Sequence, residues 1–233
     1  MTNDFSAALQ RERTQLVDTW KRVFAKTPDP VAAPFLQLRR LADGTGDKKA
    51  VGDDLRKVHD RFGWMAKESS PAGKCAGALY RTQAFMRLPA DRRVGKKLGQ
   101  TVHIEHTVPV NVLATRWLEV RQDGQAHTLA PTFGWVMHHT VATAFHKEEQ
   151  RTLKGVSKST ECFVEGAAGF GRPFKRYAGL FAQGGQVWDV YQGALVDPDQ
   201  FSLDDHFNNV VALVEEAGAS ADFVSALKTS KPQ

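Results

Sequence analysis

The spacing of apolar residues in the first hundred positions is the strongest constraint on the fold, because it follows the period of an α-helix. Between charged residues, apolar side chains recur at Phe5, Leu9, Leu16, Trp20 and Phe24. This spacing predicts an amphipathic helix that ends before Pro28 and Pro30. Similar patterns predict helices over residues 31–41, 54–67 and 69–88, with an exposed polar loop at 42–54. Residues 1–100 are therefore expected to form an α-helical region.

The pattern changes at Thr101, where a short run of β-branched residues predicts a strand that ends at Pro109. A helix is expected over residues 111–124, and residues 132–154 fit either a helix or a strand. A hairpin with its turn near Gln192 and Gly193 follows, and two amphipathic helices close the chain. Ser202 and Asp205 stand at the positions of a capping box. The expected class is α+β: a mainly α-helical N-terminal half, then a mixed α/β region with a small strand-containing core. Residues 1–100 and 101–233 are either two regions or one continuous domain.

Composition narrows the class of protein. The chain has 42% hydrophobic residues, and none of its apolar runs reaches the length of a membrane span. The first residues carry early charges and lack the apolar segment of a signal peptide, so the expected location is the cytoplasm. Cys75 and Cys162 are the two cysteines, and both are expected to be free, packed thiols. The formal net charge of +5 favours a polyanionic partner such as nucleic acid.

Histidines are concentrated in one stretch of the chain. Six of the eight lie in a window of about forty residues, at His103, His106, His127, His138, His139 and His146. Imidazoles serve as general bases near neutral pH and as metal ligands. The clustering therefore predicts a site here, with the segment Thr101–Val110 as its centre.

Within that segment, residues 104–109 read IEHTVP. This string resembles the first strand of the HNH, or ββα-metal, nucleases, in which an acid-histidine pair ends a strand. The resemblance implies that His106 is the general base and Glu105 a ligand of a divalent metal, Mg²⁺ or another. It implies a further ligand from His138, His139 or His146.

The resemblance covers at most about 45 residues and departs from the family in two ways. Asn111 follows the base by only five positions, and the distal H-x3-H spacing is missing. Adjacent residues of a regular strand also point to opposite faces, which separates Glu105 from His106. The alternative is that His106 is a core histidine and Glu105 an edge-strand charge.

Basic residues lie on both sides of this segment in the sequence. Arg92, Arg93, Lys96 and Lys97 precede it, and a second string, RPFKRY, contains Arg172, Lys175, Arg176 and Tyr177. Basic and aromatic residues in alternation can contact phosphates and stack on bases. These eight residues are predicted to bind nucleic acid, although an ordinary loop and a solvated helix face would look the same.

The hypothesis that combines these features is a metal-dependent endonuclease that hydrolyses DNA, of the restriction or phage-defence type. The first alternative is a non-catalytic, basic nucleic-acid-binding protein, phage-encoded or regulatory. The second is a small-molecule enzyme or a protein-interaction module. DNA is the expected partner and a membrane is not, and the sequence leaves a monomer and a homodimer both open.

Overall fold

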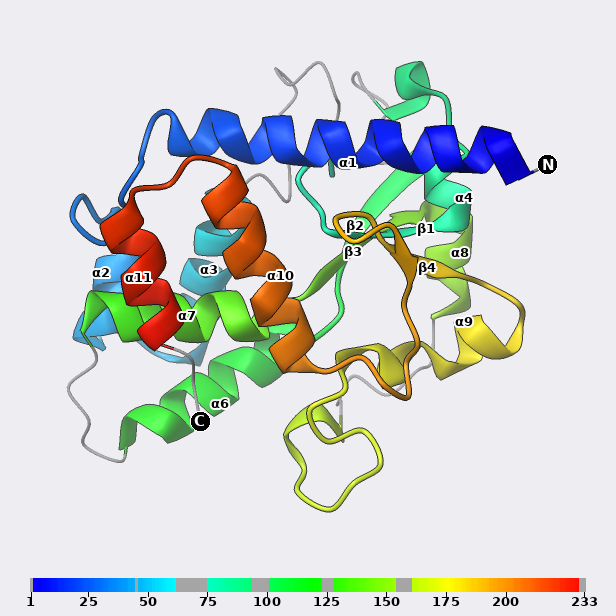
Figure 1. Ribbon diagram of the computed structural model, residues 1–233. Helices are drawn as coiled ribbons and strands as arrows, with labels where there is room; N and C mark the ends of the chain where they lie inside the picture. The colour runs from blue at the N-terminus through cyan, green and yellow to red at the C-terminus, as the bar shows by residue number, and fades with distance from the viewer. Residues whose placement is uncertain are drawn as a thin grey trace.

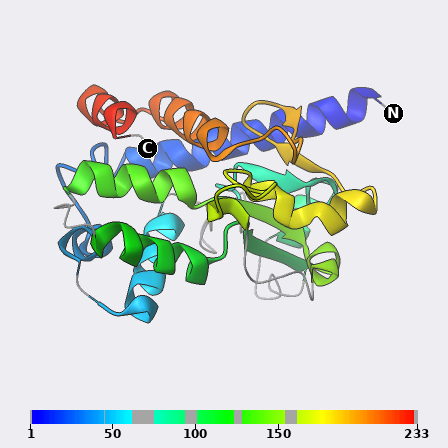
Figure 2. The ribbon, with the colours of Figure 1, turned by 90° about the horizontal axis from the view of Figure 1, so that it is seen from below.

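The computed structural model describes residues 2–44, 46–61, 75–93, 101–122, 128–153 and 161–230. A group of helices and a five-stranded sheet lie side by side, and the long helix α1 (Thr2–Phe24) runs across both (Figures 1 and 2). The predicted apolar stripe of α1 is the face it buries, since Leu16, Trp20 and Phe24 are all in the core. The class is α+β, as expected from the sequence.

The sheet has the strand order β2-β3-β1-β4-β5. Its strands are β1 (Tyr80–Thr82), β2 (Val102–His106), β3 (Ala142–His146), β4 (Val187–Asp189) and β5 (Ala194–Leu195). β1 and β3 are parallel, and the other neighbouring pairs are antiparallel. Strand β2 is therefore an edge strand of the sheet that the described residues form.

The central strand β1 corrects one prediction, because it lies inside the segment expected to be a helix at 69–88. All three of its residues are buried, and the preceding turn begins at Cys75, whose φ is 70°. A strand of three residues that is buried on both faces has no amphipathic period, so spacing alone does not separate strand from helix there. Within the described residues 75–88, the short helix α4 (Gln83–Met86) is what remains of the expected helix.

The helical part consists of α2 (Leu36–Asp43), α3 (Lys48–His59), α6 (Val110–Gln122), α7 (Leu129–His139), α10 (Leu203–Glu216) and α11 (Ala221–Thr229). Helix α3 packs against α2 and α6, and α7 packs against α10 and α11. Within the described ranges, no helix has both the length and the apolar character of a membrane span. The shorter elements are η2 (Ala90–Arg93), α8 (Lys147–Thr152), η3 (Glu161–Phe163), η4 (Pro173–Tyr177) and α9 (Ala178–Ala182).

The start of α3 is a second correction, since residues 48–53 were expected to belong to an exposed loop. The side chain of Asp47 accepts a hydrogen bond from the backbone N–H of Ala50 at 2.8 Å. This contact satisfies an amide that the first helical turn leaves unpaired, and it starts the helix at Lys48. A single capping residue thus outweighs the polar composition of the segment.

Several predictions for the last third of the chain are confirmed. Ser202 Oγ accepts from the backbone of Asp205 at 3.1 Å, and the Asp205 carboxylate accepts from the Ser202 backbone at 2.9 Å, which completes the capping box. Strands β4 and β5 form the expected hairpin, with Gly193 at a φ of 70° in its turn. Cys162 and, earlier in the chain, Cys75 are both buried, and neither forms a disulfide, as expected.

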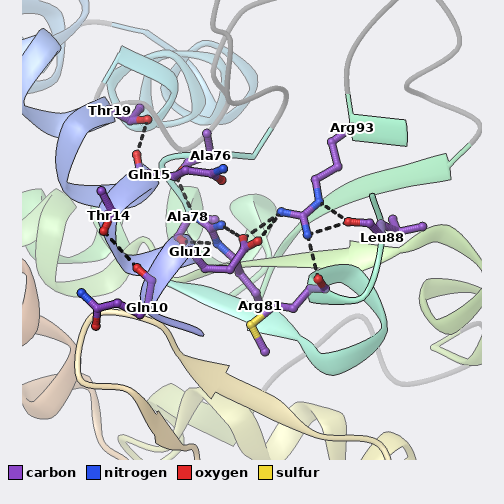
Figure 3. A network of polar contacts seen from close by, with 11 residues as sticks. Gln10, Glu12, Thr14, Gln15, Thr19, Ala76, Ala78, Arg81, Leu88 and Arg93 are labelled. Atoms are coloured by element: carbon purple, nitrogen blue, oxygen red, sulfur yellow. Dashed lines mark hydrogen bonds and ion pairs between the residues drawn. The ribbon is translucent and has the colours of Figure 1, made fainter. Parts of the chain in front are cut away.

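A buried group of charges joins α1 to the sheet (Figure 3). Glu12 of α1 forms ion pairs with Arg81 of β1 and with Arg93, whose Nη1 lies 2.7 Å from Oε1. Burial alone would raise the pKa of Glu12, but the two guanidinium groups together lower it, so the carboxylate stays ionised. The arginines donate their other hydrogen bonds to backbone carbonyls, among them those of Ala76 and Leu88.

Candidate functional site

A pocket of about 480 Å³ lies along the free edge of β2. Three elements line it: α3 through Arg56, β2 through His103 to His106, and the start of α6 through Pro109, Val110 and Asn111. The Pro109 carbonyl accepts from the Leu113 amide at 3.0 Å, so the chain turns from strand to helix within a few residues. That tight turn brings Asn111 to the same pocket as Glu105 and His106.

The pleat of β2 sends Glu105 and His106 to opposite faces of the strand, as the alternation predicts. Glu105 forms an ion pair with Arg176 of η4, Nη1 to Oε1, at 2.8 Å. The His106 ring packs instead against the His59 ring of α3, with centroids 4.9 Å apart. The pocket contains both residues because it follows the edge of the strand and not one of its faces.

Glu105 is held between two basic side chains. Its Oε2 lies 3.2 Å from Nε2 of His103, which stands two residues earlier on the same face. Burial would raise the pKa of Glu105, but His103 and Arg176 together lower it, so the group is a carboxylate near neutral pH. Arg176 also donates to the backbone carbonyl of His106 at 2.6 Å, which fixes the end of the strand.

His106 is a neutral imidazole. Burial, and then the positive fields of His59 and Arg56, lower its pKa to about 3. Its Nε2 is buried and accepts or donates no hydrogen bond among the described residues. The ring is therefore in the form that can take up a proton, and this nitrogen is uncommitted.

The other predicted ligands do not line this pocket. His138 and His139 end helix α7, where His138 Nε2 lies 3.0 Å from Asp204 of α10 and His139 Nδ1 donates to the Trp135 carbonyl at 2.8 Å. Burial lowers the pKa of His139 to about 3. His146 pairs with Val102 across the sheet, at the opposite end of the strand pair from His106. At ~3.3 Å per residue that separation is ~13 Å along the strand.

In the part of the chain that the structure describes, no group of three or more His, Cys, Asp or Glu residues is placed to hold a metal ion. The predicted combination of Glu105 with a histidine from 138, 139 or 146 is therefore not assembled here. His127 lies outside the described residues.

The residues predicted to bind nucleic acid have varied surroundings. Arg92 is exposed, Arg93 is buried with Glu12, and Lys96 and Lys97 lie outside the described residues. In RPFKRY, Arg172 is half-buried, Lys175 pairs with Asp199, and Tyr177 is buried with its hydroxyl donating to Thr107 at 3.1 Å. Arg93, Arg176 and Tyr177 thus have internal partners, and the latter two support β2.

Two residues of the pocket, His103 and Arg56, were not predicted individually as site residues from the sequence. His103 was one member of the histidine cluster, and the alternation of a strand would have placed it beside Glu105. Arg56 comes from a helix that no local signal connects with β2. Comparison of the chain with family models, curated proteins and solved structures finds no match in any of the three.

Proposed function

We propose that the protein is a cytoplasmic, metal-dependent endonuclease that hydrolyses DNA phosphodiester bonds in the pocket beside β2, in the manner of a restriction or phage-defence enzyme. One observation carries the proposal: the pocket brings together an ionised carboxylate, a neutral imidazole, an amide and an arginine, from Glu105, His106, Asn111 and Arg56. These are the groups that in-line attack of water on a phosphodiester uses.

In this reaction His106 is the general base. A water oxygen attacks phosphorus, the proton of that water passes to the His106 imidazole, and the P–O bond opposite the attacking oxygen breaks. Solvent protonates the leaving alkoxide. A divalent metal at the Glu105 carboxylate would supply Lewis-acid stabilisation of the charge that develops on the phosphate. An anionic oxygen is the donor that hard divalent cations prefer, so Glu105 fits this group.

Arg56 has two effects in the proposed site. Its positive charge attracts a phosphate, and the same charge lowers the pKa of His106. A phosphodiester bound beside Arg56 would offset that charge, which is the third cause of the lowered pKa of His106, after burial and His59.

A plasmid-cleavage assay with Mg²⁺, Mn²⁺ or EDTA tests the proposal. We expect cleavage with a metal and none with EDTA. Replacing a general base typically costs roughly 10²- to 10⁴-fold in rate, so His106→Ala and the more conservative His106→Asn should both lose cleavage while DNA binding remains. His146→Ala is the matched control, because that histidine lies at the far end of the strand pair.

Two results would contradict the proposal. Full activity in both His106 variants would remove the assigned base. Tight, salt-sensitive DNA binding without cleavage under any metal would instead identify the non-catalytic nucleic-acid-binding protein.

A further inference from the structure

The end of helix α7 places the imidazole of His138 between two possible hydrogen-bond acceptors. Its Nε2 lies 3.0 Å from Oδ1 of Asp204 at the start of α10, and its Nδ1 lies 3.3 Å from Nε2 of His139. A carboxylate oxygen can only accept, so Nε2 of His138 carries a hydrogen. Whether Nδ1 carries one as well depends on which nitrogen of His139 is protonated.

The contacts of His139 decide that question. Its Nδ1 lies 2.8 Å from the carbonyl oxygen of Trp135, which can only accept, so Nδ1 carries a hydrogen. Burial, and then the charge of His138, lower the pKa of His139 to about 3, so its ring is neutral and has one N–H only. Nε2 of His139 is therefore an acceptor, and its contact with His138 requires a hydrogen on Nδ1 of His138.

We propose that His138 is a doubly protonated, positively charged imidazolium near neutral pH, and that it joins α7 to α10 through a contact that opens as the pH rises. One of its nitrogens donates to a neutral imidazole and the other to an anion. Loss of either hydrogen sets a nitrogen lone pair against the lone pair of its acceptor, so one of the two hydrogen bonds is lost. This assignment does not depend on any activity in the β2 pocket.

Two further ionisable side chains act on this pair of histidines. Burial, and then the charge of His138, lower the pKa of His206 of α10 to about 3, so its ring is neutral. The guanidinium of Arg116 in α6 adds a smaller positive field at His139. A neutral ring and a cation do not offset a positive charge on His138, so Asp204 is the group in this set that does.

Burial makes the loss of either hydrogen bond costly. The side chain of His138 is 8% exposed, and its ring packs against that of Phe207 with centroids 5.5 Å apart. A polar atom left without a partner in such surroundings destabilises the folded state. The contact lies just before β3, the strand that pairs with β2, so its opening affects the support of the β2 pocket.

The direction of the pH effect follows from the charge of His138. The folded chain holds this proton more tightly than the unfolded chain, in which a histidine loses it near pH ~6.5. The stability that the contact contributes is therefore complete below about pH 6.5, and it is lost as the pH rises until the folded chain also releases the proton. The neutral rings of His139 and His206 act in the opposite direction, at lower pH.

Nitrogen-15 nuclear magnetic resonance of the full chain tests the assignment, because imidazole nitrogen shifts distinguish the imidazolium from each neutral tautomer. Near neutral pH we expect two protonated nitrogens on His138 and one on His139, at Nδ1. The signals of His138 are those that disappear in His138→Gln. In Asp204→Asn, His138 should lose its proton about one pH unit lower than in wild type.

Asp222→Asn is the matched control. Asp222 is the second residue of α11, as Asp204 is of α10, and both are exposed. The substitution removes the same charge from the same position of a helix, so it should leave the titration of His138 unchanged.

Urea unfolding measures the effect on conformation. Between about pH 6 and about pH 9, the equilibrium constant of unfolding should rise about tenfold more in wild type than in Asp204→Asn. Asp222→Asn should follow wild type. A single protonated nitrogen on His138 near neutral pH, or a titration that Asp204→Asn leaves in place, overturns the assignment. An equal rise in wild type and Asp204→Asn overturns the pH-dependent contact. Far-ultraviolet circular dichroism of each variant shows that the differences do not come from loss of the fold.

Discussion

Glu12 and Glu105 each lie between two basic side chains, yet the two groups of charges differ in their access to water. Glu12 contacts Arg81 and Arg93, and all three side chains are 7% exposed or less. Glu105 contacts Arg176 and His103 on an edge strand, and the His103 side chain is 39% exposed. In both groups the basic neighbours keep the carboxylate ionised despite its burial.

The difference is that one group of charges is closed off from water and the other borders a pocket. Besides the bonds to Glu12, Arg81 and Arg93 donate to backbone carbonyls around β1 and α4, so every guanidinium nitrogen of both residues has a partner inside the protein. A fully paired, buried group of this kind fixes one arrangement of the chain. Around Glu105, by contrast, the imidazole of His103 lines a pocket beside the ion pair of Glu105 with Arg176. Of the two groups, only the second lies beside this pocket.

The largest effect should follow from removing the carboxylate of the buried group that Glu12, Arg81 and Arg93 form. Glu12→Gln leaves two buried arginines without their counter-charge, and breaking a buried ion pair in this way costs about 3–5 kcal/mol. Glu105→Gln should cost less, about 1–3 kcal/mol, because water can reach the side of the group that His103 occupies. Urea unfolding followed by tryptophan fluorescence gives both free energies. Equal losses of unfolding free energy, or a larger loss for Glu105→Gln, would show that solvent exposure does not decide how much each carboxylate contributes to stability.

The same comparison shows what could be predicted from the sequence. Strand β2 and helices α1, α10 and α11 were predictable because a half-buried element leaves a periodic pattern. The alternation of β2 also separates Glu105 from His106 and places His103 beside Glu105. Strand β1 was missed because it is buried on both faces and has no such pattern.

The partners in both groups of charges were not predictable, because they come from distant parts of the chain. Glu12 is 69 residues from Arg81 and 81 residues from Arg93, and no local pattern connects them. Arg93 and Arg176 were therefore read as nucleic-acid contacts, since a basic residue in a sequence gives no sign of an internal carboxylate. Only the fold reveals which arginine is already paired.

A smaller effect should appear in the pH dependence of the free energy of unfolding. His106 in the pocket contributes to this dependence, whereas the buried group of Glu12, Arg81 and Arg93 does not. His106 has a folded pKa of about 3 against an unfolded value near 6.5, so the unfolded chain takes up the proton first. Stability therefore falls as the pH drops below about 6.5, until the folded pKa is reached. His139 and His206, both buried with pKa values of about 3, act in the same direction. Asp189, whose pKa burial raises to about 6, opposes them in part.

Two variants separate these contributions. Between about pH 7 and about pH 5.5, each buried histidine should cost roughly 1 kcal/mol of unfolding free energy. His106→Asn should reduce the loss over this interval by that amount, whereas Glu12→Gln should leave it unchanged, because Glu12 is ionised throughout. Unfolding curves at the two pH values measure the difference. If the fall in unfolding free energy between the two pH values is smaller in Glu12→Gln, the group of Glu12, Arg81 and Arg93 titrates near neutral pH.

The smallest effect distinguishes an arginine of the pocket from a matched arginine elsewhere. Arg56 is 51% exposed and pairs with Asp53 at i,i+3, and Arg116 is 48% exposed and pairs with Glu119 at i,i+3. Only Arg56 lines the pocket. Because both are surface residues, Arg56→Gln and Arg116→Gln should each change stability by less than about 0.5 kcal/mol.

Their effects on DNA binding should differ. If Arg56 contacts one phosphate, Arg56→Gln should weaken binding for all sequences alike and reduce the slope of log K against log salt by about 0.9, whereas Arg116→Gln should leave that slope unchanged. Fluorescence anisotropy at several salt concentrations, with the metal omitted, measures both slopes. Equal slopes in the two variants would mean that the pocket does not contact the DNA backbone through Arg56. The Arg56 charge, which contributes to the lowered pKa of His106 after burial and His59, would then not be offset by the substrate.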